Sequence, residues 1–312
     1  MVDLSRVQAR SAGAPSPFDP DEGRAYRRWR EWKLAGYPRD VAELVVPVAD
    51  PHRLSGAERQ AVLDRCRRAN MAVYQLAGPA DKGAIAALGH QFGLDHLDGN
   101  LWSDEDSITS LRVSGQGRRK GEYIPYTPQR LNWHTDGYYN TEAQRVRAFI
   151  LHCVRPAASG GMNGLLDHEI AYILLRDANP DFIRALMAPD AMTIPANVEG
   201  GVEIRPARSG PVFLVEPETG NLYMRYSARL RNVVWHDDPV TRAAAAFLQD
   251  LWENGCEFAY HHRLVPGQGV ICNNVLHSRT AFEDAEGSGR LLYRARYLER
   301  IRGTDFRTVY PG

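Results

Sequence analysis

The segment GQGVICNNVLHSRTAFEDAEGSGRLLYRARY, residues 267–297, contains the pattern that decides the predicted fold. An apolar, strand-like run in it ends at His277, and a second strand-like run follows Arg290. Side chains on a strand alternate between its two faces, so Arg290 and Arg294 are predicted to share one face, with Tyr293 on the other. Two guanidinium groups on one face, just after a histidine, favour an anion-binding site beside a candidate metal ligand.

Short runs of the same kind, split by Gly, Pro and Asn, recur from about residue 108 to the C-terminal end. This spacing is typical of β-sandwiches and β-barrels, so we expect a mainly β fold that is braced by helices. Apolar residues at helical spacing, flanked by capping residues, predict three helical insertions in this part of the chain. They are expected at 167–176, after 179–180 and at 238–255.

The N-terminal part of the chain has a different character. Residues 1–20 are rich in Ser, Ala, Pro and Gly with little periodicity, so they are expected to be a flexible lead-in. Residues 21–312 are expected to form a single domain. Within it we expect a helical part over about 21–107 and a β core with helical insertions over about 108–312.

Charge and composition argue against several classes of protein. The chain has 38 Lys and Arg against 38 Asp and Glu, and this balance argues against binding to nucleic acid or to an anionic membrane. No apolar run reaches the roughly 18 residues of a membrane span. The four cysteines show no CxxC pairing, which is typical of reduced cytoplasmic proteins. We therefore expect a cytoplasmic protein that binds a small molecule; the sequence leaves its oligomeric state open, a homo-oligomer included.

The ten histidines include three His-x-Asp pairs, which begin at His96, His134 and His236. Two residues in such a pair lie on the same face of a strand and can bind one metal ion together. The pair at His236 is placed where Asp238 would cap a helix, and the pair at His96 lies in a predicted turn. The remaining pair, His134 with Asp136, fits a strand end, and we select it as the candidate ligand pair.

A second histidine from another strand would complete a two-His-one-carboxylate triad, which leaves positions on Fe(II) open for a co-substrate and O2. We select His277 because the arginine pair follows it. His261 and His262 face opposite sides of their strand, and no such pair follows them. Two alternatives remain open: a jelly-roll protein that binds metal or ligand without turnover, and a zinc hydrolase with the same triad. The hydrolase would leave Arg290 without a function.

The motifs occur in the order that is typical of a known family: His134-Thr135-Asp136, Gly160-Gly161, NNVLHSR, and Arg290 with Arg294. In this the sequence resembles the taurine dioxygenase and clavaminate synthase-like family of Fe(II)- and 2-oxoglutarate-dependent oxygenases. The resemblance implies a double-stranded β-helix, that is, a jelly roll or cupin-like barrel. It also implies that His134, Asp136 and His277 hold iron and that Arg290 binds the distal carboxylate of 2-oxoglutarate.

The resemblance further implies the reaction. The chain is expected to be a dioxygenase that consumes O2 and 2-oxoglutarate, releases succinate and CO2, and hydroxylates or otherwise oxidises a small polar molecule. That substrate is expected to be anionic or amino-acid-like. Arg294 is expected to bind its anionic group, and Tyr138, Tyr139 and Arg225 are expected to line its site.

One position departs from the family pattern. Relatives often carry an acidic residue and then Thr after the double glycine, and the Thr hydroxyl helps to hold 2-oxoglutarate. This chain has Met162 and Asn163 there. Asn163 is therefore expected to donate the corresponding hydrogen bond from its side-chain amide.

Overall fold

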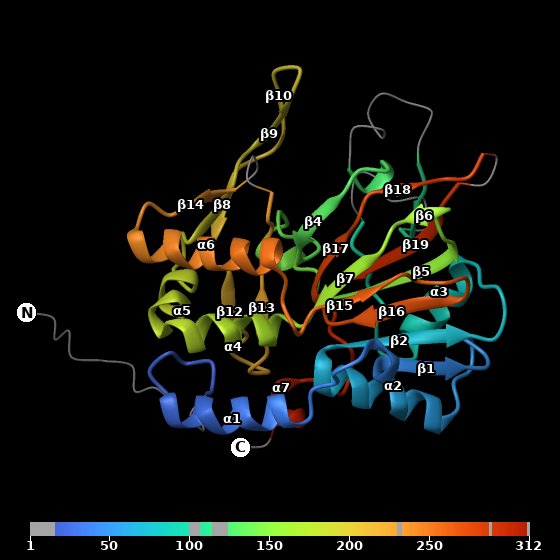
Figure 1. Cartoon of the computed structure of the whole chain (residues 1–312), viewed down its shortest axis with the longest axis horizontal. Coiled ribbons are helices and arrows are strands. Elements are labelled where there is room, and N and C mark those ends of the chain that lie inside the picture. The colour runs from blue at the N-terminus through green and yellow to red at the C-terminus, as the bar shows by residue number, and fades with distance from the viewer. Residues whose placement is uncertain (1–15, 100–106, 114–123, 230–232, 287–288, 311–312) are drawn as a thin grey trace, which may run out of the picture.

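Two facing β-sheets form the centre of the molecule (Figure 1). One sheet has six strands in the order β1–β2–β16–β5–β19–β3, and the other has four in the order β15–β7–β17–β4. Phe149 of β5 and His277 of β17 lie between them, with ring centroids 4.6 Å apart. The predicted jelly roll is confirmed. The computed structural model describes residues 16–99, 107–113, 124–229, 233–286 and 289–310.

The pairing within both sheets is antiparallel except between β1 and β2, which are parallel. The strands of the six-stranded sheet are β1 Val45–Val48, β2 Met71–Leu76, β16 Gln268–Cys272, β5 Ala148–Arg155, β19 Leu291–Tyr297 and β3 Thr109–Leu111. Those of the four-stranded sheet are β15 Tyr260–His262, β7 Asn163–Leu166, β17 Leu276–Arg279 and β4 Leu131–His134.

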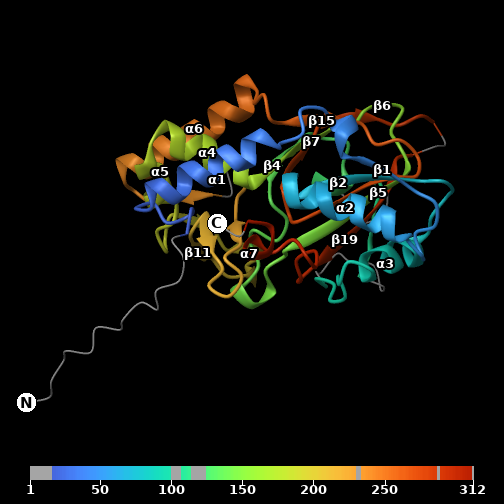
Figure 2. The same ribbon diagram turned by 90° about the horizontal axis from the view of Figure 1, so that it is seen from below.

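The strands β2 and β5 of the six-stranded sheet are buried on both faces, which explains why each reads as a largely apolar run without alternation. In β2, Met71 and Val73 belong to the cluster between the two sheets. Ala72 and Tyr74 belong to a second cluster, under the helices α2 (Gly56–Ala69) and α3 (Lys82–His90). Figure 2 shows both helices on the side of this sheet that faces away from the other sheet.

A second group of helices lies beside the four-stranded sheet (Figure 1). Local capping explains where they begin. Asp238 accepts a hydrogen bond from Thr241 N–H at 2.8 Å, and Pro239 occupies the first helical position of α6. These helices are α1 Gly23–Ala35, α4 His168–Ala178, α5 Pro180–Leu186, α6 Pro239–Asn254 and the short α7 Phe306–Val309. The three predicted insertions correspond to α4, α5 and α6.

Smaller strand groups lie outside these two sheets. One of them, the hairpin of β9 and β10, projects from the body of the molecule (Figure 1). The groups are β6 Ser159–Gly160 with β18 Phe282–Glu283, β8 Met192–Ile194 with β11 Arg208–Gly210 and β14 Val234–Trp235, β9 Asn197–Glu199 with β10 Val202–Arg205, and β12 Phe213–Val215 with β13 Leu222–Met224. None of the helices in the described part of the chain is long and apolar enough to cross a membrane.

The N-terminal lead-in expected over residues 1–20 falls mostly outside the described residues. Its described end differs from the expectation, because Phe18 is fully buried. The Phe18 ring lies 4.8 Å from that of Trp29 and 4.7 Å from that of Phe306. Arg176 also donates hydrogen bonds to the backbone carbonyls on both sides of this residue, at positions 17 and 20. An aromatic side chain with a place in the core thus orders a segment whose composition predicted flexibility.

His152 makes the fold sensitive to acid. The side chain lies in β5 with 1% exposed, and burial lowers the pKa of its imidazole to about 4. The buried Tyr74 hydroxyl stays protonated because burial raises its pKa, and it forms a hydrogen bond with His152 Nδ1 at 3.2 Å. The folded protein therefore holds a neutral ring at a pH where the unfolded chain, with a histidine pKa of about 6.5, already binds a proton.

We predict that the free energy of unfolding falls as the pH drops from about 6.5 towards 4, because the unfolded state then binds the extra proton. The His152→Gln variant lacks this titration, so its decrease over that range should be smaller by up to about 3 kcal/mol. Urea unfolding of both proteins across the range measures the difference. Parallel stability curves for the two proteins would contradict the assignment.

Candidate active site

Two neighbouring strands bring the candidate ligands together. In the antiparallel pairing of β4 with β17, His134 stands directly opposite His277, and their ring centroids are 4.2 Å apart. Asp136 follows His134 by two residues, just beyond the end of β4. The three side chains are buried, and one ligand atom from each lies within 4.8 Å of the others. Among the described residues, no other three His, Cys, Asp or Glu side chains converge in this way.

Hydrogen bonds to the backbone orient both imidazoles. The Nδ1–H of His134 donates to the carbonyl of Asn132 at 2.8 Å, and that of His277 donates to the carbonyl of Val275 at 3.0 Å. This leaves both Nε2 atoms as acceptors. They lie 3.7 and 3.9 Å from Oδ1 of Asp136. A donated Nδ1–H of this kind is the usual partner of a histidine that binds metal through Nε2.

The protonation states also suit metal binding. Burial, reinforced by the nearby His277, lowers the pKa of His134 to about 3, and burial lowers the pKa of His277 as well. Burial, the largest single effect, would raise the pKa of Asp136, but Arg294 together with His277, Arg296 and His134 outweighs it and holds that pKa below its usual range. The triad therefore presents two neutral imidazoles and a carboxylate at neutral pH, which is the ligand form that metals require.

The donor set fits Fe(II). Two imidazole nitrogens and one carboxylate, on one side of a metal, are the ligands of non-haem Fe(II) oxygenases. Oδ2 of Asp136 is buried and has no hydrogen-bond partner among the described atoms. Burying a hydrogen-bond acceptor without a partner costs free energy of folding, and a cation bound to this oxygen would offset that cost.

A turn directs Asp136 towards the histidines. Gly137, the next residue, has φ +69°, and a methyl group added to it would lie 2.6 Å from Cγ2 of Val146. Both observations make glycine the residue that fits at this position. The turn begins at Asp136, two residues after the end of β4, and Oδ1 of Asp136 lies within 4 Å of Nε2 of both histidines.

The two predicted arginines differ in their surroundings. Nη1 of Arg294 donates to Oδ1 of Asp136 at 3.2 Å, while its Nε is buried without a described partner. Arg290 is 4% exposed, and its guanidinium lies against the ring of Phe282 at 5.1 Å. Within the described part of the chain, no carboxylate forms an ion pair with Arg290. Burial lowers its pKa to about 10, so the group remains a charged, buried cation at neutral pH.

The double-glycine segment lies beside Arg290, because a methyl group added to Gly161 would be 3.8 Å from Arg290 Nε. Asn163 is buried in β7, and its Nδ2 donates to the carbonyl of His262 at 3.4 Å. Asn163 also stands directly opposite Arg279 of β17. Its predicted hydrogen bond to 2-oxoglutarate remains a prediction.

Arg279 was missed by the sequence analysis. It donates to the carbonyls of Pro125, at 3.4 Å, of Thr127, at 2.8 Å, and of Gln129. It thereby holds the segment that leads into β4. Its guanidinium also lies 4.7 Å from the centre of the Phe282 ring. The alternation of side chains along a strand could have predicted its position, because Arg279 comes two residues after His277 and so lies on the same face of the strand.

The tyrosines that follow Asp136 lie close to the triad. The rings of Tyr138 and His134 meet edge to face, with centroids 6.3 Å apart. The hydroxyl of Tyr139 accepts a hydrogen bond from Arg296 Nη1 at 3.1 Å. Arg296 in turn forms a buried ion pair with Asp98 at 2.6 Å.

Asp98 and Arg296 were not among the predicted site residues. The pair that begins at His96 is predicted to lie in a turn. In the structure its Asp98 pairs with Arg296 of β19, the strand that carries Arg294 and begins just after Arg290. Arg296 lies two residues beyond Arg294, so strand alternation could have placed it on the same face.

Arg225 differs from its predicted role in substrate binding. Its guanidinium donates to four backbone carbonyls: those of Tyr138 at 2.9 Å, Met192 at 3.0 Å, Gly210 at 3.1 Å and Arg208 at 2.7 Å. These bonds use four of its five N–H groups. Arg225 therefore joins β8, β11 and the loop after the ligands, where it holds the backbone of Tyr138.

The remaining histidine candidates lie apart from the triad. His236 is exposed and pairs with Asp190 at 3.0 Å, and His96 is exposed and pairs with Glu299. His262 hydrogen bonds to the side chain of Gln268 at 2.9 Å. None of them belongs to the convergent group, which agrees with the choice of His134, Asp136 and His277.

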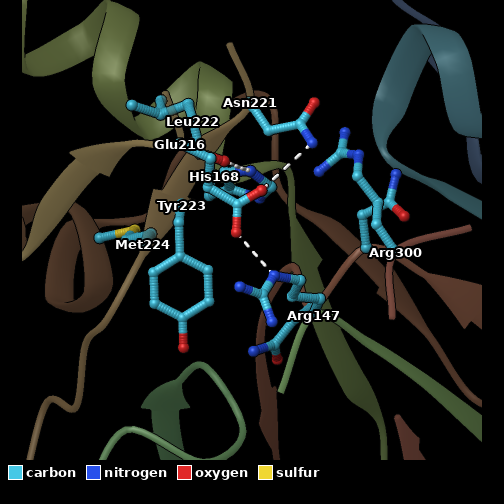
Figure 3. A pocket seen from close by; sticks show the side chains of 10 residues that line it. Arg147, His168, Glu216, Asn221, Leu222, Tyr223, Met224 and Arg300 are labelled. Carbon is cyan, nitrogen blue, oxygen red and sulfur yellow. Dashed lines mark hydrogen bonds and ion pairs between the residues drawn. The ribbon is translucent and has the colours of Figure 1, made fainter. Parts of the chain in front are cut away.

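A separate polar pocket does not compete with this site. Its walls include Glu216, which accepts hydrogen bonds from Arg147 at 2.6 Å and Asn221 at 3.3 Å (Figure 3). The cavity volume is about 10 Å³. This is room for about one water molecule, too little for an organic substrate.

Comparisons with known proteins agree with this geometry. Residues 34–296 match the family described as "Taurine catabolism dioxygenase TauD, TfdA family". A uridine-5'-phosphate dioxygenase from Amycolatopsis sp is 30% identical over 179 residues, which are 55% of this chain and 62% of that protein. A uridine-5'-phosphate dioxygenase from Streptomyces sp is 29% identical over 143 residues, which are 46% of this chain and 50% of that protein. The chain thus spans less than two thirds of the length of these relatives.

Solved structures share the fold. An asparagine oxygenase in complex with Fe(II), 2S,3S-3-hydroxyasparagine and succinate has a TM-score of 0.56 at 20% identity and covers 80% of this chain and 81% of its own. A taurine dioxygenase from Burkholderia xenovorans has a TM-score of 0.52 at 22% identity, with coverages of 84% and 89%. Because the family match extends over most of the sequence, this chain belongs to the TauD/TfdA family of taurine catabolism dioxygenases.

Proposed function

We propose that this chain is an Fe(II)- and 2-oxoglutarate-dependent dioxygenase that oxidises a small, polar, anionic molecule. The observation that carries the proposal is the convergence of His134, Asp136 and His277 on neighbouring strands. It is joined by the buried guanidinium of Arg290, just before β19 of the facing sheet, which forms no ion pair with a described carboxylate. A metal triad alone would also suit a zinc hydrolase. Arg290 is the feature that favours a dicarboxylic co-substrate, since a hydrolase has no use for it.

In this proposal the triad holds Fe(II) through two imidazole Nε2 atoms and the Asp136 carboxylate. With 2-oxoglutarate and O2, such a centre supplies the oxidation of a C–H bond, coupled to decarboxylation of 2-oxoglutarate to succinate. Arg290 binds the distal carboxylate of 2-oxoglutarate by a charge-assisted, bidentate pair. Since Arg290 is buried, its attraction for that carboxylate is stronger than it would be in water.

The charges around the triad support an anionic substrate. The Arg294 and Arg296 guanidiniums both act on Asp136, and Arg205 lies 5.8 Å from the ring of Tyr139. Among the described residues, the Arg294 guanidinium contacts Asp136 through Nη1, and its Nε has no hydrogen-bond partner. We propose that Arg294 binds the anion and that Tyr138 and Tyr139 line the substrate site.

We further propose a phosphate monoester such as a nucleoside 5'-phosphate as the first substrate to examine. Two relatives are named for uridine 5'-phosphate. A dianionic phosphate also suits the cationic surroundings of the triad, because a planar guanidinium binds phosphate oxygens in a bidentate way. Amino acids and sulfonates are the comparison set, since the solved relatives include an asparagine oxygenase and a taurine dioxygenase.

We predict that the protein with Fe(II), 2-oxoglutarate and O2 forms succinate in step with the loss of uridine 5'-phosphate or another anion of the set. The variants His134→Ala, Asp136→Ala and His277→Ala should each abolish this coupled turnover, because each removes a ligand. His96→Ala and His236→Ala are the matched controls and should retain it. Substrate hydrolysis without succinate would instead identify a hydrolase.

The Arg290→Ala variant should bind 2-oxoglutarate more weakly by about 1.5–3 kcal/mol, the usual worth of hydrogen bonds to charged groups. This corresponds to a roughly 10- to 150-fold higher Kd. Arg290→Lys keeps the charge but loses the planar guanidinium, so its Kd should lie between those of the unaltered chain and Arg290→Ala. Anaerobic calorimetry measures the values, with Arg24→Ala on the exposed face of α1 as control. An unchanged Kd for Arg290→Ala would remove this residue from the co-substrate site.

A further inference from the structure

The side chain of Asn274 holds the backbone of a metal ligand on both sides. Its Oδ1 accepts the N–H of Asp136 at 2.8 Å, and its Nδ2 donates to the carbonyl of the same residue at 3.0 Å. Nδ2 also donates to the carbonyl of Val146 at 2.7 Å. The amide is 4% exposed, so these three bonds form where water does not compete.

The position of Asn274 in the chain gives these bonds their importance. It lies in the turn between β16 and β17, three residues before His277. Val146 lies just before β5. One amide therefore joins three segments: the end of β4 with Asp136, the approach to β5, and the turn that leads into the strand of the distal histidine.

The backbone of Asp136 needs such support. β4 ends at His134, so the sheet ladder does not extend to the carboxylate ligand. Gly137, with φ +69°, then turns the chain. The side chain of Asn274 takes the place of a strand neighbour, since it offers one acceptor and one donor to the peptide groups on either side of the Asp136 Cα atom.

The backbone conformation of Asn274 is energetically unfavourable for a residue other than glycine. Its φ is +48°, in the left-handed region that non-glycine residues rarely adopt. Asparagine is the residue after glycine that enters this region most readily. A glycine here would relieve the backbone but would not hold Asp136. The hydrogen bonds of the side chain, more than the conformation of the turn, therefore explain why asparagine occupies this position.

We propose that Asn274 is a positioning residue of the metal centre, which fixes the Asp136 carboxylate relative to the two histidines and thereby sets the affinity of the triad for its metal. The proposal rests on the proposed function only for the identity of the metal as Fe(II). It does not depend on the substrate.

The neighbouring Asn273 supplies a matched control. Its Nδ2 donates to Asn70 Oδ1 at 3.0 Å and Thr304 Oγ1 at 3.1 Å, and its Oδ1 accepts the N–H of Ile301 at 3.2 Å. It is as buried as Asn274, and both line the small pocket of Figure 3. None of these hydrogen bonds goes to a ligand residue. The two asparagines thus separate support of the fold from support of the metal site.

The experiment compares Asn274→Gly with Asn273→Gly in the full chain. Anaerobic titration with Fe(II), and with Mn(II) as a redox-stable probe, gives the Kd of the metal, and thermal unfolding of the metal-free proteins gives the Tm. Asn274→Gly should raise the Kd by about 10- to 100-fold, the usual effect of losing a residue that orients a metal ligand. Asn273→Gly should lower the Tm but leave the Kd of the folded protein within about twofold of the unaltered chain.

A double-mutant cycle completes the test. If Asn274 acts through Asp136, adding Asn274→Gly to Asp136→Ala should weaken metal binding no further. Asn274→Asp, which replaces the Nδ2 donor by an oxygen facing two carbonyls, gives the same answer if the glycine variant fails to fold. Equal Kd values for the unaltered chain and Asn274→Gly, or equal losses for both asparagine variants, would overturn the proposal. Metal binding without succinate formation would instead refute the proposed function and leave this inference intact.

Discussion

The direct pairing of β4 with β17 is the constraint on which the site depends. Residues opposite each other in an antiparallel pair project from the same face at close range, and here those residues are His134 and His277. A slip of one residue would turn one imidazole to the other face and destroy the site. The register is held by burial: Leu165 of β7 stands on the other side of His277, and Phe149 covers it from the facing sheet.

Around that pairing the protein assembles more buried positive charge than its own acids balance. Asp98 neutralises Arg296, and Asp136 contacts Arg294, but the guanidinium of Arg290 forms no ion pair with a described carboxylate, and Asp284 accepts only its backbone N–H. Burying an unpaired charge costs free energy unless a counter-ion is supplied. The cost is offset when anions bind, which is why co-substrate and substrate are both expected to be anionic. Of the positioning residues, Asn274 is uncharged, whereas Arg225 remains a cation whose guanidinium is held by four backbone carbonyls.

The sequence was most informative where the signal is local. Helix starts depend on one capping side chain and its neighbours, so the starts of α4, α5 and α6 could be predicted from Asp167, Asn179 and Asp238. The sequence was misleading where a contact between distant parts of the chain determines whether a residue is buried or which groups it binds. Phe18 lies in a segment of flexible composition but is buried among aromatic rings. Arg225 looked like a pocket residue, and only the folded chain shows that four carbonyls surround its guanidinium.

The sequence by itself determined the type of chemistry, since the identity and order of the His, Asp and Arg residues restrict the ligand set and the co-substrate, and strand alternation assigns their faces. Only the tertiary structure shows which polar groups already have hydrogen-bond partners within the protein. Asn274 and Arg279 stand out only when their backbone partners, more than 120 residues away in the chain, are in place. The physical reason is that hydrogen-bond satisfaction is a property of the folded interior, and neither periodicity nor composition records it.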